Sequence, residues 1–419
     1  MPGAPADASR NASLAAERAN QRNVVIACFL GWTLDAFDFF VVTFVVIPIA
    51  NDFHESIVKI TGAIAASLFT RPIGAFIFGL LADRYGRRLP LVIDILFYSV
   101  VEILSGLAPS YSVFIALRLL YGIGMGGEWG VGASLAMESV PAKSRGIVSG
   151  LLQEGYAFGN LLAAIAFWLV YPHFGWRPLF FIGSVPALLT LLILFKVKES
   201  ETWRQTAKHA DWSAYWRAVA GNWKLFAYLI ALMAMVNFIS HGTQDLYPTF
   251  LQSQRGYSPG MTTLITVISM VGAIAGGLLV GLYSDRRGRR RAMIVAAILA
   301  IVLIPLWIAA PNLPLILLGA FLMQFMVQGA WGVIPAHINE LSPDTLRGFF
   351  PGFAYQVGVL IASGSAYIEA MMGRHMTYSH AMGLFALIVL FFGAIVIGCG
   401  PEAHRIPFGR ANSESSPPA

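Results

Sequence analysis

Long apolar runs separated by short polar or basic loops recur along almost the whole chain. Each run is long enough to cross the roughly 30 Å hydrocarbon core of a bilayer as a helix. Isolated strands are not expected, because a helix or a closed barrel is needed to satisfy backbone groups in lipid. We place spans at residues 24–50, 60–82, 89–107, 111–136, 146–170, 178–197, 224–251, 261–283, 290–310, 313–337, 348–370 and 378–399. The pattern predicts an all-α integral membrane protein with twelve transmembrane helices.

Composition and charge agree with this prediction and orient the chain. It is 57% hydrophobic and 12% charged, with a mean hydropathy of +0.67, which is too apolar for a soluble surface. The net charge of +6 does not indicate a nucleic-acid partner, because 22 of the 28 Lys and Arg lie on one side of the twelve-span arrangement. This bias predicts a multi-pass protein of the cell (inner or plasma) membrane, embedded in the lipid bilayer with both termini in the cytoplasm.

The segments outside the spans divide the chain. Residues 1–23 are polar and Ala-rich with no cleavable leader pattern, so we expect a cytoplasmic tail followed by a retained first span. Residues 198–223 form a charged, Trp-rich cytoplasmic linker between two six-helix halves, 24–197 and 224–399, and the tail 400–419 is expected to be disordered after Pro401. Cys28 and Cys399 both lie within spans, so no disulfide framework is implied.

The two halves are copies of one unit. The motif Gly79-x-x-x-Asp83-Arg84-x-Gly86-Arg87-Arg88 returns as Gly281-x-x-x-Asp285-Arg286-x-Gly288-Arg289-Arg290, 202 residues later. The same offset relates Trp129 to Trp331, Glu138 to Glu340 and Arg145 to Arg347. A duplicated unit with an even number of spans predicts parallel repeats, related by an axis along the membrane normal.

With this motif placed twice between spans, the chain resembles the major facilitator superfamily over essentially its whole length. The resemblance implies the major facilitator fold, with two six-helix halves. We expect the repeated loops to act as cytoplasmic gates in which an Asp accepts hydrogen bonds at neighbouring helix ends and pairs with Arg, while glycines allow tight turns. The gate residues are Asp83, Arg84, Gly86, Arg87, Asp285, Arg286, Gly288 and Arg289. The alternative is that these are ordinary positive-inside loops, which would explain the arginines but not the repeated Asp and Gly.

The seventh span carries a polar stripe in an apolar helix, made of Asn237, Ser240, His241, Thr243, Gln244 and Asp245. Such residues are expensive in lipid and face a partner or a water-filled cavity. The stripe resembles the seventh-span signature of proton-coupled lactate and pyruvate permeases of the fungal type, which belong with the sialate–proton symporters. By resemblance, Asn237, His241, Gln244 and Asp245 line the substrate path. A satisfied polar contact between helices is the alternative.

Arg71 lies twelve residues before Asp83 in the second span, about 18 Å deep. A buried guanidinium needs an anion, and its planar fork suits a carboxylate. We therefore expect Arg71 to bind the substrate carboxylate, and the resemblance agrees. The alternative is a structural pair with Asp35, Asp38 or Asp245.

A second set of buried charges suits proton coupling. Asp35 and Asp38 lie one turn apart in the first span, where desolvation favours the protonated form of one of them. Arg118 resembles the fourth-span arginine that is often linked to proton coupling in the superfamily, although a structural pair between Arg118 and Glu128 is equally open. Together with Asp245 and Glu154 of the fifth span, these residues form the predicted proton-coupling set.

Other polar residues extend the predicted cavity. Gln356 is the repeat partner of Glu154 and resembles a substrate-contacting Gln of the permeases, and Tyr355 precedes it. One turn later the permeases carry Asn, where this chain has Val359. Gln324, Gln328 and Trp331 in the tenth span are interpreted as cavity lining or, alternatively, as helix packing.

We therefore predict a proton-coupled symporter of small monocarboxylates such as lactate or pyruvate, working as a monomer by alternating access. Its partners are a small organic acid and a proton, and no nucleotide-binding loop or metal constellation indicates a cofactor. Three alternatives remain. They are a symporter of a larger acid such as sialate or an aromatic acid, a nutrient sensor that binds without transporting, and a membrane enzyme using His241 and Asp245, although no nucleophile accompanies that pair.

Overall fold

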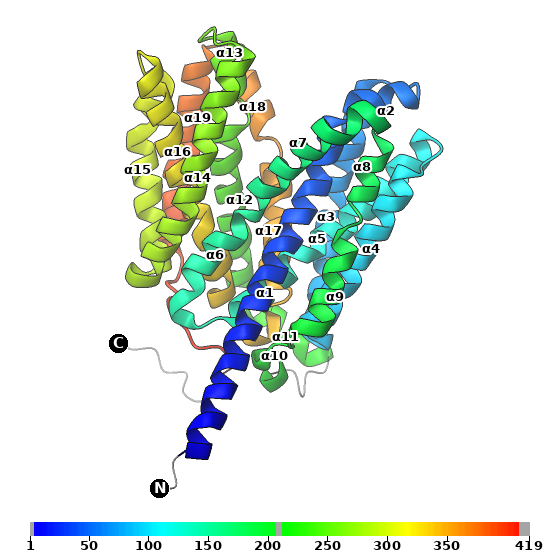
Figure 1. Ribbon diagram of the computed structural model, residues 1–419. Helices are drawn as coiled ribbons and strands as arrows, with labels where there is room; N and C mark the ends of the chain where they lie inside the picture. Colours follow the sequence, from blue (N-terminus) through cyan, green and yellow to red (C-terminus); the bar gives the residue numbers. More distant parts are fainter. Residues whose placement is uncertain (1–3, 207–211, 410–419) are drawn as a thin grey trace.

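The apolar runs are helices in the computed structural model, which describes residues 4–206 and 212–409, and these residues contain no strand (Figure 1). The N-terminal half comprises α1 (Ala4–Phe44), α2 (Val46–Asp52), α3 (Ile57–Tyr85), α4 (Arg88–Gly106), α5 (Tyr111–Ser139), α6 (Arg145–Gln153), α7 (Gly155–Phe174), α8 (Arg177–Ile182) and α9 (Pro186–Lys196). The linker holds α10 (Glu201–Thr206) and α11 (Trp212–Gly221). The C-terminal half comprises α12 (Trp223–Gln244), α13 (Tyr247–Ser253), α14 (Pro259–Arg287), α15 (Arg289–Ala309), α16 (Leu313–Leu341), η3 (Asp344–Leu346), α17 (Phe350–Ala362), α18 (Ser365–Met372) and α19 (Tyr378–Cys399).

Ten helical segments among the described residues are long and apolar enough to cross a membrane. The other two predicted spans coincide with α5 and with the pair α17–α18. Helix α5 has 29 residues, but Arg118, Glu128 and a run of glycines make it less apolar. The eleventh span is divided between α17 and α18 near Ser363, so neither piece is long enough alone.

Three segments outside the predicted spans have structure that the sequence analysis did not describe. Helix α1 begins at Ala4 rather than near residue 24, as Ala and charged residues with high helix propensity allow. The linker is helical in α10 and α11. Residues 402–409, expected to be disordered, are held against both halves by the contacts described below, while residues 410–419 of the predicted tail lie outside the described residues.

Glycines let repeat-related helices pack closely in each half. Gly126 of α5 lies against the carbonyl oxygen of Arg71 in α3, and Gly276 of α14 lies against that of Phe325 in α16, so a Cβ at either glycine would collide with backbone. The pairs α3–α5 and α14–α16 are each other's equivalents in the duplicated unit. Small residues are the usual means of close helix approach in membranes.

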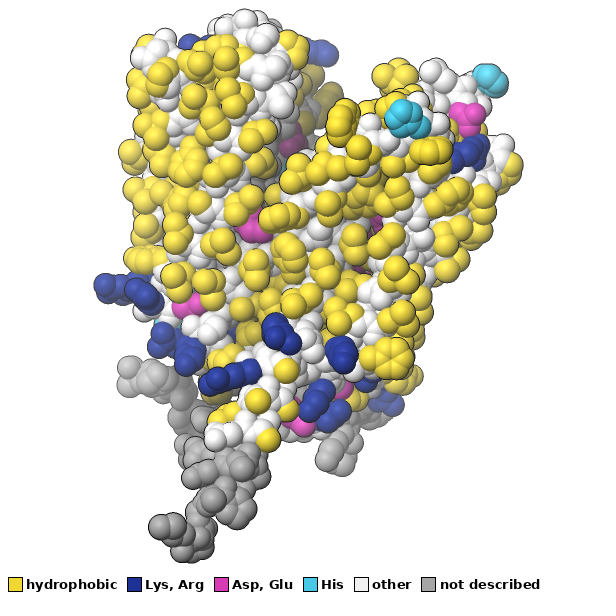
Figure 2. Space-filling view, viewed as in Figure 1, with side chains coloured by type: hydrophobic (Ala, Val, Ile, Leu, Met, Phe, Trp, Pro, Cys, Tyr) yellow, Lys and Arg dark blue, Asp and Glu magenta, His cyan; other side chains and the backbone are white. Residues whose placement is uncertain are grey.

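The halves meet at one end of the bundle, the end where both termini lie, which we call the basic end (Figure 1). There α6 packs on α14 and α16 of the other half, while α17 packs on α3 and α5. Towards the opposite end, α7 packs on α1 and α8, and α18 packs on α12 and α19, each within its own half. Figure 2 shows a hollow between the halves at that opposite end and Lys and Arg side chains gathered near the basic end. The protein is therefore closed at the basic end and open at the other.

Candidate functional site

An aromatic cluster joins the halves between the hollow and the basic end. The ring of Tyr355 on α17 lies 4.3 Å from Trp129, 5.7 Å from Trp331 and 6.4 Å from Trp32, centroid to centroid. Tyr156 on α7 stacks on Trp32 at 5.9 Å. Trp129 and Trp331 are repeat partners, so each half contributes the same residue. All except Tyr156 are buried, and the cluster separates the hollow from the closed end.

The polar stripe of α12 is part of an amide network in the C-terminal half. Gln328 of α16 donates to the Ser240 hydroxyl at 3.0 Å, and Gln244 donates to Gln324 at 3.0 Å. Gln324 in turn donates to the Thr243 hydroxyl at 3.2 Å. Because these side chains bond to one another across two helices, the network agrees with both predicted roles, cavity lining and helix packing.

His241 and Asp245 form the exposed part of that stripe. His241 Nδ1 lies 3.2 Å from an Asp245 carboxylate oxygen, and the two side chains are 38% and 37% exposed. Asp245 is within electrostatic reach of Tyr156 in the other half, so the pair faces the hollow. Asn237, by contrast, is buried and donates to the Met233 carbonyl of its own helix at 2.7 Å.

Arg71 is buried, at 4% exposure, and among the described residues it makes no ion pair. Its Nε and Nη2 have no hydrogen-bond partner. Asp35 of α1 is within electrostatic reach of Arg71, but no direct contact joins them. The predicted alternative, a structural pair with an internal acid, is therefore not formed in this state, and the guanidinium is available to an anion.

The acids of α1 are also without partners. Asp35 and Asp38 are buried, and none of their four carboxylate oxygens accepts a hydrogen bond within the described structure. One prediction allowed a pair between Arg118 and Glu128, and this pair does not form. Arg118 instead donates two 3.0 Å hydrogen bonds to Glu102 of α4. Glu102 had no predicted role, and an acid within an apolar span was the only signal that could have suggested one.

Glu154 and Gln356, related by the repeat, each reach the opposite half. Glu154 lies at the junction of α6 and α7, and a side chain at Gly277 of α14 would collide with it. Gln356 Nε2 donates to the Gly126 carbonyl of α5 at 3.4 Å. Both residues therefore sit where the halves must separate for the basic end to open.

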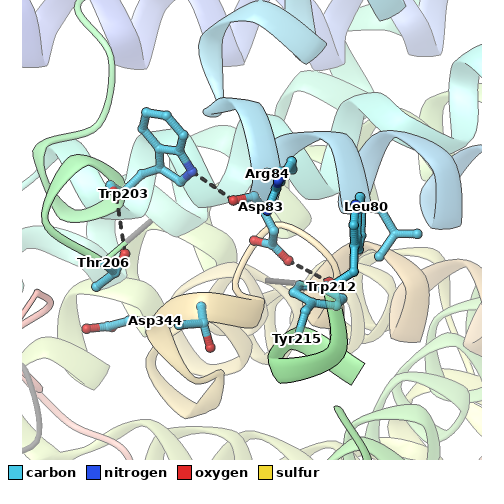
Figure 3. Close-up of a pocket in the computed structure, with 9 residues that line it drawn as sticks. Leu80, Asp83, Arg84, Trp203, Thr206, Trp212, Tyr215 and Asp344 are labelled. Atoms are coloured by element: carbon cyan, nitrogen blue, oxygen red, sulfur yellow. Dashed lines mark hydrogen bonds between the residues drawn. The ribbon is translucent and has the colours of Figure 1, made fainter. Parts of the chain in front are cut away.

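The first gate motif closes the basic end through Asp83. One carboxylate oxygen accepts from the Gly348 N–H at 2.7 Å, and the other accepts from the Phe349 N–H at 3.1 Å and the Tyr215 hydroxyl at 3.0 Å. The Trp203 indole donates to the Asp83 carbonyl at 2.8 Å (Figure 3). Burial and then the adjacent Asp83 charge raise the pKa of Tyr215, so this phenol stays a donor. Both aromatic residues come from the linker, for which the sequence suggested no such role.

The second motif makes the equivalent contacts in the other direction. Asp285 accepts from the Gly146 and Ile147 N–H groups at 2.8 and 3.0 Å. Each Asp thus caps the start of a helix from the opposite half, where backbone N–H groups lack partners and a negative charge is favoured. Gly86 and Gly288 end their helices at φ 98° and 100°, values that favour glycine.

Buried ion pairs complete the gate. Glu138 accepts from Arg87 at 3.0 Å and lies 3.5 Å from Arg347, while Glu340 accepts from Arg289 at 2.9 Å and lies 3.4 Å from Arg145. Each Glu therefore holds one Arg of its own half and one of the other. Arg84 and Arg286 are exposed, with Arg84 over the Trp212 ring at 5.5 Å. The predicted gate geometry is present, and its role in transport stays a prediction.

The segment 402–409 lies across the same gate. The Phe408 ring is sandwiched between the guanidinium groups of Arg145 and Arg347, 3.3 and 3.6 Å from its centroid. These two arginines are repeat partners from opposite halves. Arg405 donates to the Asp285 carbonyl at 2.7 Å, and the Gly409 N–H donates to Asp344 at 2.9 Å.

Comparison with known proteins identifies the family. Residues 28–263 match the model of the Major Facilitator Superfamily. The chain belongs to the major facilitator superfamily. Residues 217–402 of this major facilitator also match the model described as "Sugar (and other) transporter". It is therefore a member of a transporter family and not an enzyme.

Three relatives of this superfamily member carry transporter names. A carboxylic acid transporter protein homolog of Saccharomyces cerevisiae is 30% identical over 82% of this chain, which spans 60% of the yeast protein. A probable 4-methylmuconolactone transporter of Cupriavidus pinatubonensis is 30% identical and covered over 94% of both chains. The sialic acid transporter NanX of Escherichia coli is 28% identical over 91% of this chain and 94% of its own.

A solved structure confirms the predicted fold of this major facilitator. The proton:xylose symporter XylE superposes with a TM-score of 0.75, covering 94% of this chain and 98% of that chain at 19% identity. At that identity the likeness concerns the fold alone. An all-α membrane protein built of two helical halves is what the apolar runs and the repeat predicted.

The structure brings together most of the residues predicted for the site of this superfamily member. Arg71, Tyr355 and Asp245 share the surroundings of Tyr156 at the hollow, and Gln244 and Gln328 lie in the adjoining amide network. Asn237 and Arg118 have their hydrogen bonds elsewhere, in their own helix and with Glu102 respectively. The contact of Phe408 with Arg145 and Arg347, which we call the Phe408 clasp, was not predicted, because both arginines are more than 60 residues away in sequence.

Proposed function

We propose that the protein is a proton-coupled symporter of an organic acid, working by alternating access. The observation that carries this proposal is Arg71, a buried guanidinium without an anion beside a hollow between the halves. In a poorly hydrated site, the planar guanidinium group can donate two parallel hydrogen bonds to one carboxylate. The substrate would then supply the missing negative charge.

Proton coupling follows from the surplus of buried acids in the same half. Asp35 and Asp38 have no hydrogen-bond partner, while Arg118 is committed to Glu102. Ionised carboxyl groups are costly in such surroundings unless paired, so uptake and release of a proton there is the less expensive route. A carboxylate on Arg71 and one protonated acid would cross the membrane as a nearly neutral load.

We further propose that the substrate is larger than lactate, such as sialate or an aromatic acid. Two observations support this choice. Relatives covered over most of their length are named for methylmuconolactone and sialic acid. In addition, Tyr156 and Tyr355 offer aromatic faces near Arg71, which suit a flat or ring-containing body.

Lactate or pyruvate is the second candidate, favoured by the α12 signature from Asn237 to Asp245. Val359 stands against it, because an Asn is expected there by resemblance to the permeases. We also propose that the basic end faces the cytoplasm of a cell (inner or plasma) membrane, as the Lys and Arg bias predicts. The hollow of this structure then faces outward, and the protein works as a monomer.

Uptake by proteoliposomes tests the function. Radiolabelled benzoate, sialate and lactate are offered separately, with and without an imposed pH gradient. For one proton per substrate, a gradient of one pH unit drives about tenfold accumulation. Accumulation of benzoate or sialate above lactate supports the larger-acid proposal, and lactate alone supports the second candidate. Binding of an acid without uptake would identify a sensor, and uptake that ignores the gradient would contradict proton coupling.

A further inference from the structure

Glu128 is a buried acid that has no role in the proposed substrate site. It lies in the glycine-rich part of α5 at 3% exposure. A side chain at Gly31 of α1 would collide with its Oε1, and its Oε2 has no hydrogen-bond partner. No ion pair involves Glu128 in the part of the chain that the structure describes. A carboxyl group is thus held between two helices with nothing to balance a charge.

A pocket leads from Glu128 towards the basic end. It spans about 380 Å³, including space that is open to solvent, and is lined by residues of α1, α4, α5, α6 and α16, among them Cys28, Trp32, Leu91 and Pro335. Leu91 is the fourth residue of α4, which starts at the basic end, whereas Glu128 is eleven residues, about 16 Å, from the end of α5. Trp32 and Trp129 belong both to this pocket and to the aromatic cluster, so they stand between the pocket and the hollow.

The titratable groups that face Glu128 are mostly acids. They are Cys28, Asp35 and Asp38 on α1, and Asp94 and Tyr98 on α4. Apolar residues complete the surroundings: Leu189 of α9 lies beside the same Gly31, and Leu152 of α6 and Pro335 of α16 line the pocket. Of the arginines in this half, Arg71 interacts electrostatically with Asp35, and Arg118 forms an ion pair with Glu102.

Arg71 is therefore the guanidinium left for Asp35, and no ion pair reaches Glu128 within the described residues. A buried carboxylate without a cation is costly, which favours keeping a proton on such a group.

We propose that Glu128 releases the transported proton through this pocket to the basic end, on a path separate from that of the substrate. The inference rests on the proposed symport. A proton taken up from the hollow is held on Asp35 while the substrate carboxylate occupies Arg71. When the substrate leaves, the Asp35 carboxyl group gives its proton to Glu128 and, as a carboxylate, pairs with Arg71. Glu128, protonated at rest, passes one proton to water entering the pocket for each proton that it receives, so charge and protons balance.

The path explains how proton and substrate stay coupled. The same guanidinium binds either the substrate or Asp35, so the proton leaves only after the substrate has left. The gate between the halves passes the substrate, whereas the pocket, which is lined mainly by helices of the N-terminal half together with Pro335 of α16, passes the proton.

Reconstituted transporter carrying Glu128→Gln tests the proposal with the acid that the wild type accumulates. We expect counterflow exchange within about twofold of wild type, because no substrate contact is lost. Accumulation under a gradient of one pH unit should fall from about tenfold to none, and proton entry, followed with a trapped pH dye, should fall in parallel. Glu128→Asp, which keeps a carboxyl group, should restore part of both.

Two further variants make the test specific. Asp94→Asn removes an equally buried and unpartnered acid that does not line the pocket, and it should accumulate substrate like wild type. Leu91→Trp fills the pocket without removing an acid and should slow accumulation while leaving exchange intact, which also covers the case in which Glu128→Gln does not fold. Wild-type accumulation by Glu128→Gln, or equal loss in Asp94→Asn, would overturn the proposal. If the wild type itself ignores the pH gradient, the proposed symport fails, and this inference fails with it.

Discussion

At the scale of single residues, Arg71 and the acids around it determine what the hollow can bind. A buried guanidinium cannot lose its charge, so an anion that reaches it is strongly favoured. In the state described here Asp35, Asp38 and Asp245 do not contact it directly. An empty transporter of this kind therefore holds a positive charge ready for a carboxylate.

The first prediction is that Arg71→Lys weakens carboxylate binding roughly tenfold to a hundredfold while the protein still folds. A compact ammonium group keeps the charge but cannot donate two parallel hydrogen bonds. Substrate-induced thermal shift or tryptophan quenching measures the change. Binding of wild-type strength in this variant would show that Arg71 is not the carboxylate partner.

The second prediction concerns Asp38, the acid of α1 that we expect to receive the proton from the hollow and hand it to Asp35. Asp38→Asn places a neutral amide where the protonated acid stands, so exchange of substrate should continue while accumulation against a gradient is lost. Asp245→Asn is the matched variant, because Asp245 is half exposed and already has His241 as a partner. We expect it to keep accumulation. If both variants respond to a pH gradient like the parent, neither acid carries the proton.

At the scale of elements, the segment 402–409 connects the two halves at the basic end. Phe408 lies between Arg145 of α6 and Arg347, just before α17. Each arginine also belongs to a buried ion pair with Glu340 or Glu138. The aromatic ring thus adds to an interface that must come apart when the basic end opens.

The third prediction is that Phe408→Ala shifts the population towards opening at the basic end. Two cation–π contacts are each worth about 0.5–2 kcal/mol, so the shift should be roughly tenfold. Distances between spin labels on α6 and α17 measure it. Ile406→Ala, at a side chain that is 40% exposed in the same segment, should change little. An unchanged distance distribution in Phe408→Ala would mean that the clasp does not bias the gate.

At the scale of the whole molecule, duplication makes the closed end nearly symmetric. Asp83 and Asp285 each cap a helix of the opposite half, and Glu138 and Glu340 each bridge two arginines. The linker and the C-terminal segment then break the symmetry, because Tyr215 bonds the Asp83 carboxylate while Arg405 bonds the Asp285 backbone.

The fourth prediction follows from this arrangement. Asp83→Asn and Asp285→Asn should each slow transport about tenfold or more, because the charge-assisted bonds to helix N-termini and to arginine are lost. Equilibrium binding of substrate should persist, since neither residue lines the hollow. Initial uptake rates and binding isotherms, measured on the same preparations, show whether transport slows while binding is retained. Loss of binding in either variant would argue that these loops do more than gate.

The amino-acid sequence alone is sufficient to predict the membrane class, the repeat and most of the charged residues of the site and the gate. Lipid forces apolar runs to be helices, and a constant offset of 202 residues is visible without a structure. The depth of Arg71, Asp35 and Asp38 along their helices also follows from the rise per residue.

Which of these residues contact one another depends on the tertiary structure. Partner choice depends on how helices rotate and pack, so Arg118 pairs with Glu102 rather than Glu128, and Arg71 stays without an acid. The closure of one end, the Phe408 clasp and the pocket at Glu128 arise from contacts between segments far apart in the chain. Periodicity and spacing report on one helix at a time, and such contacts are set by the free energy of packing several helices together.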